Sequence, residues 1–60
     1  MKMRHEITFT QYNLRTGMLH ESRTVFIRPR VLTTTGAERM VRAVYPHMVA
    51  VTRIDIMGVA

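Results

Sequence analysis

The sequence predicts a small α+β domain of ββαβ order, in which a three-stranded antiparallel sheet has one helix packed on one face. Three observations lead to this fold. Two stretches of alternating residues flank a turn-forming segment near the start of the chain. A stretch with helical spacing of apolar residues follows, and a third alternating stretch ends the chain. With 60 residues, the region 1–60 is expected to form a single domain.

The first strand is predicted over residues 3–12. One side of it carries Met3, His5, Ile7 and Phe9, and the other side carries Arg4, Glu6, Thr8 and Thr10. Alternation with a period of two is typical of a strand that buries one face. The following segment, Asn13 to Gly17, contains the residue types that tolerate tight-turn backbone angles, so we expect the chain to turn back.

The second strand is predicted over residues 19–28, where a proline, which cannot donate to a strand ladder, follows. It would pair with the first strand as a hairpin. We expect Ile7 opposite Val25 and His5 opposite Ile27, with a five-residue loop, because this register puts the apolar residues of both strands on one face.

The helix is predicted over residues 35–45. Thr35 and Glu38 have the spacing at which each side chain can cap a free backbone N–H near the other. Apolar residues recur at helical intervals along one stripe, formed by Ala37, Met40, Val41 and Val44. Pro46 is expected to end the helix.

The last strand is predicted over residues 48–58 and is apolar on both faces. One face carries Met48, Ala50, Ile54 and Ile56, and the other carries Val49, Val51 and Met57. The sheet face away from the helix would carry Lys2, Arg4, Thr8, Thr10, Tyr12, Phe26, Arg28 and two valines of the last strand. A homodimer, joined by sheet faces or by edge strands, would cover these apolar residues. The alternative is a bulge that turns the valines inward.

The composition favours a binding protein with an acidic partner. Eight arginines and one lysine outweigh four acidic residues, which gives a net charge of +5. The alternative to a functional explanation of the arginine excess is a GC-rich genome, which can produce the same bias. A chain of this size buries only about 60% of its unfolded surface. Without cysteine it cannot form disulfides or thiolate metal sites, so a second copy is the remaining source of stability.

Catalysis and metal binding are not expected. His5 and His20 both lie in a Met-x-His-Glu pattern, but the expected register separates them by roughly 23 Å, too far to share a metal. His47, beside the end of the helix, is suited to bonding terminal carbonyls. The chain has one serine, no cysteine and three scattered glycines, which offer neither a nucleophile triad nor a phosphate loop. We therefore expect no enzyme activity, cofactor or metal.

The leading hypothesis is an adaptor or inhibitor that docks on an acidic surface of a larger protein, of the kind that phages and other mobile elements often encode. The partner-binding residues would be Arg4, Tyr12, Phe26, Arg28, Arg30, Arg39 and Arg42. The alternative is a nucleic-acid-binding module, in which the same arginines bind phosphates and the aromatic rings stack on bases.

The helix start offers a further anion site. Free N–H groups at Thr35 and Gly36 would meet the positive end of the helix dipole, near Arg28 and Arg30. An ordinary capping box that occupies those donors is the alternative. No stretch of about 18 apolar residues is present, so we expect a cytoplasmic protein without membrane contact.

Overall fold

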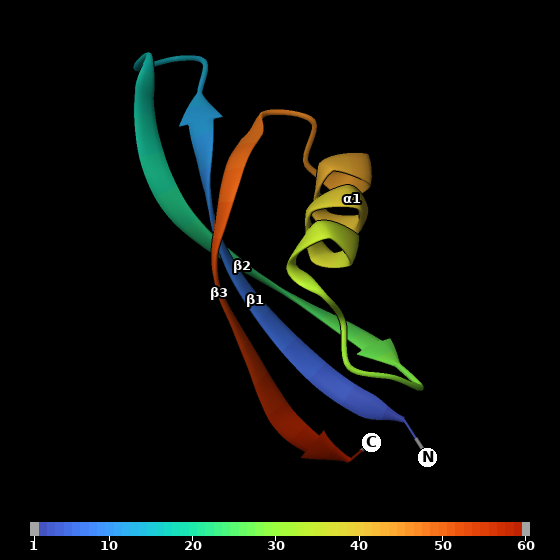
Figure 1. Cartoon of the computed structure of the whole chain (residues 1–60). Helices are drawn as coiled ribbons and strands as arrows, with labels where there is room; N and C mark the ends of the chain where they lie inside the picture. The colour runs from blue at the N-terminus through green and yellow to red at the C-terminus, as the bar shows by residue number, and fades with distance from the viewer. Residues whose placement is uncertain (1, 60) are drawn as a thin grey trace.

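The computed structural model describes residues 2–59. The elements in chain order are β1 (Met3–Asn13), β2 (Met18–Arg28), α1 (Thr34–Val44) and β3 (Met48–Val59). The strands form one antiparallel sheet with the order β2-β1-β3, and α1 lies against one face of it (Figure 1). The predicted ββαβ fold with a three-stranded antiparallel sheet is therefore confirmed. Each element begins and ends within one residue of the range expected from the sequence.

The hydrophobic core lies between α1 and the two strands β1 and β3. Its buried residues are Ile7, Phe9, Ala37, Val41 and Met48. Phe9 is fully buried, and its ring centroid lies 4.9 Å from that of Tyr45, the residue at the end of α1. Half-buried side chains complete the core, namely Phe26, Leu32, Tyr45, Val51 and Ile54. β1 supplies the two largest fully buried apolar side chains, Phe9 and Ile7, because it is the middle strand and lies beneath the helix.

The hairpin register differs from the expected one by a single residue. Ile7 pairs with Thr24, and His5 pairs with Phe26. The reason is the turn, which is one residue shorter than expected because Asn13 pairs directly with Met18. Gly17 closes this turn with a φ of 69°, and its N–H donates to the Asn13 carbonyl oxygen at 2.8 Å.

The consequence for β2 is an exchange of faces, because a slip of one residue turns every side chain to the other side. Phe26 lies on the helix side of the sheet and packs against the core. Val25 and Ile27 lie on the opposite side and are exposed. The prediction that these two residues share a face with Ile7 and Phe9 was therefore wrong.

A bulge in β3 accounts for part of the apolar pattern on both faces of this strand. Thr8 pairs with Arg53, whereas Phe9 pairs with Val51, so Thr52 is the extra residue. This shift turns Val51 toward the helix side, where it packs against the core. The bulge expected as the alternative is thus present and accounts for Val51, although Val49 stays exposed.

The helix begins one residue earlier than expected, so the predicted capping box is wrong. Thr33 is the N-cap, and its side-chain oxygen accepts a hydrogen bond from the Gly36 N–H at 3.1 Å. Glu38 then falls beyond the first turn, where it cannot form the reciprocal bond of a capping box. In the predicted apolar stripe, Ala37 and Val41 are buried, Met40 is half-buried and Val44 is exposed.

Candidate interaction surfaces

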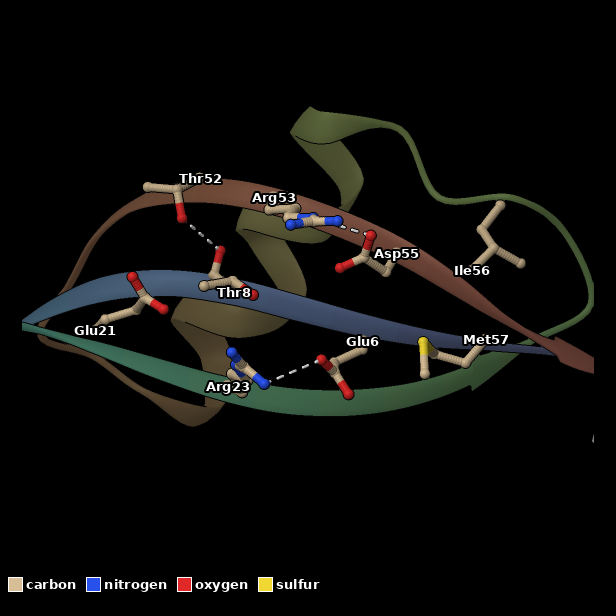
Figure 2. Close-up of a pocket in the computed structure, with 9 residues that line it drawn as sticks. All are labelled: Glu6, Thr8, Glu21, Arg23, Thr52, Arg53, Asp55, Ile56 and Met57. Atoms are coloured by element: carbon tan, nitrogen blue, oxygen red, sulfur yellow. Dashed lines mark hydrogen bonds and ion pairs between the residues drawn. The ribbon is translucent and has the colours of Figure 1, made fainter.

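The sheet face that α1 leaves uncovered, called the open face here, contains a groove of about 640 Å³. Figure 2 shows this groove with α1 behind the sheet. All three strands contribute to it, through Glu6, Thr8, Glu21, Arg23, Thr52, Arg53, Asp55, Ile56 and Met57. Pairing brings these residues together, because Thr8 lies between Arg23 on β2 and Arg53 on β3. This groove was not predicted from the sequence, since its residues meet only through the pairing of the strands.

Acidic side chains are concentrated in the groove. It holds three of the four acidic residues of the chain, together with two arginines. Arg23 Nη1 lies 3.7 Å from Glu6 Oε1, and Arg53 Nε lies 3.0 Å from Asp55 Oδ1. The two arginine side chains are 67% and 73% exposed, so each pair contributes less than about 1 kcal/mol to stability. The charged residues of the groove sum to −1, so the rest of the chain carries +6.

Two threonines, Thr8 and Thr52, line the groove together with its charged side chains. Thr8 is buried, and its carbonyl oxygen accepts a hydrogen bond from the Thr52 hydroxyl at 3.2 Å. The bulge residue therefore bridges β1 and β3 within the groove (Figure 2). Within residues 2–59, no group of three or more histidine or acidic side chains is arranged to hold a metal ion.

The three histidines lie apart. His5 is fully buried on the helix side, where its Nε2 accepts a hydrogen bond from the Leu32 N–H at 3.2 Å. Its Nδ1 is also buried and has no partner among the described residues. His20 is exposed and pairs with Gln11, whereas the expected register, with Ile7 opposite Val25, would have placed it opposite Tyr12. His47 is exposed, and its carbonyl oxygen accepts from the N–H of Tyr12 at 3.1 Å. His5 therefore fixes the segment that leads to α1.

The predicted partner-binding residues fall on two sides of the sheet. Arg4 and Tyr12 lie on the open face, opposite Ile27 and Leu19 of β2. Phe26 and Arg28 lie on the helix side, and the Arg28 guanidinium carbon stands 5.6 Å from the centroid of the Phe26 ring. The two aromatic residues expected to share a face are therefore separated by the sheet.

The other predicted arginines belong to the helix side. Arg28 ends β2, Arg30 lies on the segment that runs from β2 to α1, and Arg39 and Arg42 belong to α1. All four are exposed, and we call them the basic side. Arg39 and Arg42 are three residues apart and are neighbours on the helix surface. In the part of the chain that the structure describes, ion pairs involve only Arg23 and Arg53, so the basic side has no carboxylate partner.

The predicted anion site at the helix start is smaller than expected. The Gly36 N–H is already bonded to the N-cap hydroxyl of Thr33. A Cβ at Gly36 would lie 3.3 Å from that oxygen, so the cap is tightly fitted around the glycine. Thr35 is exposed, and its N–H is among the free donors of the first turn. Of the two predicted residues, only Thr35 keeps a backbone donor for a ligand.

Comparison of the chain with protein-family models, with curated proteins and with solved structures found no match. Among the described residues, no helix has the length and apolar character needed to cross a membrane. The distribution of charge and the exposed apolar side chains therefore carry the functional inference.

Proposed function

We propose that this chain is a small non-enzymatic interaction protein, an adaptor or inhibitor, that docks through its basic side on an acidic surface of a larger partner protein. The supporting observation is the segregation of charge. The acidic residues of the open face reduce the charge of that face, while four exposed arginines on the helix side lack a carboxylate partner in the described chain. Carboxylates of a partner could form bidentate hydrogen bonds with these guanidinium groups.

The neighbours of the basic side favour a protein partner over a nucleic acid. Val31 follows Arg30 directly, and Val44 follows Arg42 by two residues. Both valine side chains are more than half exposed. Apolar side chains interspersed with arginine resemble the composition of protein interfaces. A phosphate backbone would give the valines no apolar contact.

The nucleic-acid alternative loses its stacking surface in this fold. Tyr12 and Phe26 lie on opposite sides of the sheet, and one face of the Phe26 ring is already covered by Arg28. Phosphate binding without stacking remains as the competing outcome of the test.

The expected single domain, cytoplasmic location and mobile-element origin stay predictions.

An affinity pull-down from source cells, with and without nuclease, tests the proposal. We expect a protein to be recovered after nuclease treatment. The variant Arg39→Ser/Arg42→Ser should lose it, because two neighbouring guanidinium groups of the basic side are removed. The matched control is Arg4→Ser/Arg15→Ser, which removes the same charge from the open face and from the hairpin turn.

A titration against duplex DNA at several salt concentrations separates the competing outcome. Phosphate binding predicts that the logarithm of affinity falls linearly with the logarithm of salt, with a slope of about −0.9 per phosphate contact. Recovery of nucleic acid alone in the pull-down, together with such a slope, would replace the protein partner by a nucleic acid.

A further inference from the structure

The free edge of β2 is a long and regular strand edge. β2 is an outer strand, and its 11 residues pair with β1 without any shift in register. The helix packs over β1 and β3 and leaves this edge uncovered (Figure 1). Four large apolar side chains of β2 are exposed: Met18 at 67%, Leu19 at 50%, Val25 at 40% and Ile27 at 44%. Such an edge can pair with a further strand unless a bulge, a proline or a charge prevents it.

The outer edge of β3 differs in this respect. Its pairing with β1 is interrupted by three register shifts, and Gly58 near its end has a φ of 114°. Irregularities of this kind disrupt a ladder and turn an edge away from other strands. Of the two outer strands, β2 is therefore the one that can accept a partner over its full length.

The charges at the middle of β2 identify the partner. Glu21 and Arg23 lie on the same face, one on each side of Ser22. If a second copy of β2 lies antiparallel with Ser22 opposite Ser22, then Glu21 of each copy lies opposite Arg23 of the other. Opposite charges placed directly across a ladder are stabilising. Glu21 has no ion pair among the described residues, and the Arg23 side chain, which lies 3.7 Å from Glu6, is 67% exposed.

We propose that two copies of this chain associate through their β2 edges, in an antiparallel ladder centred on Ser22. The ladder spans residues 18–26 and creates a six-stranded sheet of order β3-β1-β2-β2-β1-β3. The same register pairs Leu19 with Val25 on the open face and Met18 with Phe26 on the helix side. Apolar residues that are exposed in one copy thus contact apolar residues of the other copy, and Glu21 of each copy lies opposite Arg23 of the other.

Neighbouring registers lack this agreement. A ladder centred on Glu21 or on Arg23 places that residue opposite its own copy, and like charges directly opposite are destabilising. A ladder centred on Thr24 places Glu21 opposite Ile27, and one centred on His20 places Glu21 opposite Leu19. Only the ladder centred on Ser22 satisfies both charges and both apolar pairs.

The dimer has a consequence for the proposed function. Its two-fold axis is perpendicular to the sheet, so both α1 helices lie on the same side and both basic sides face one direction. A partner with two acidic patches could then engage both copies, which raises the overall affinity. This consequence rests on the proposed function, whereas the dimer itself does not.

Crosslinking through single cysteines tests the register, since the chain contains none of its own. Directly opposed residues in an antiparallel ladder have Cα atoms about 4.5–5.5 Å apart, within the range of a disulfide. Ser22→Cys should therefore form a covalent dimer under mild oxidation. Thr24→Cys alone should not, because its two copies would lie about 14 Å apart along the ladder. A mixture of Thr24→Cys with His20→Cys chains should crosslink between the two kinds of chain.

Charge reversal gives a second readout. Glu21→Arg places two arginine pairs in opposition, so we expect the dimer to weaken about tenfold or more in sedimentation. The exchange Glu21→Arg/Arg23→Glu should restore association. Circular dichroism checks that each variant keeps the fold.

A monomeric mass of the wild type at micromolar concentration would overturn the proposal, as would equal crosslinking of the Ser22 and Thr24 variants. Neither result would alter the pull-down with the Arg39/Arg42 variant.

Discussion

Replacement of Phe9 by alanine should remove a large part of the stability of the monomer. Phe9 is fully buried beneath α1 and contacts the ring of Tyr45. Phe→Ala substitutions in protein cores cost about 3–5 kcal/mol. A stability of about 0.05–0.15 kcal/mol per residue gives this 60-residue chain about 3–9 kcal/mol in total. We therefore expect Phe9→Ala to lose about 3–5 kcal/mol, which unfolds the chain at 25 °C if its total stability lies in the lower half of this range.

Urea denaturation followed by circular dichroism measures this loss. Val49→Ala serves as the control, because Val49 is an exposed β-branched residue on β3 and should change stability by less than about 1 kcal/mol. All samples should be compared at one protein concentration, since association would stabilise the folded state. A loss below about 1 kcal/mol for Phe9→Ala would refute the position of the core between α1 and β1.

Three further experiments test local features of the fold. Thr33→Ala should lower the free energy of unfolding by about 1 kcal/mol through loss of the N-cap, whereas Thr35→Ala should leave it nearly unchanged. If urea denaturation instead showed the larger loss for Thr35→Ala, the N-cap would be Thr35, as predicted from the sequence. Gly17→Ala should cost about 1–2 kcal/mol, because an L side chain is strained at a φ of 69°, and an unchanged thermal midpoint would contradict the turn. A double-mutant cycle on Glu6 and Arg23 should give a coupling free energy below about 1 kcal/mol, and added salt should reduce it. A larger coupling free energy would contradict the exposed position of this ion pair.

The sequence predicted the elements and their order because periodicity is a local property. Alternating residues identified β1 and β2, and the spacing of Ala37 and Val41 identified the buried face of α1. The bulge in β3 was foreseen only as an alternative, since a strand apolar on both faces is also typical of a covered strand.

The details that failed depend on single-residue choices that periodicity does not decide. β2 has apolar residues on both faces, so its pattern accepted either register, and the four-residue turn decided between them. Three consecutive threonines, Thr33 to Thr35, could each have capped the helix. The cap fell on Thr33, where the third residue along is Gly36, whose lack of a side chain leaves room for the threonine hydroxyl.

The candidate surfaces were predictable in part. The excess of arginine and the exposure of Arg30, Arg39 and Arg42 followed from the sequence. Their separation from Glu6, Glu21 and Asp55 did not, because it depends on which face of the sheet each strand residue occupies. The one-residue slip of β2 moved Phe26 and Arg28 to the helix side, and the pairing of β1 with β3 brought the acidic groove together.

The most direct test of the docking surface is the dissociation constant of the purified partner for three chains: the wild type, Arg39→Ser/Arg42→Ser and Arg4→Ser/Arg15→Ser. Hydrogen bonds to charged groups contribute about 1.5–3 kcal/mol each, so loss of two should weaken binding at least about a hundredfold. The control should stay within about threefold of the wild type at physiological salt, because its arginines lie away from the basic side. Equal weakening of the two variants would contradict the account, since binding would then follow net charge rather than the basic side.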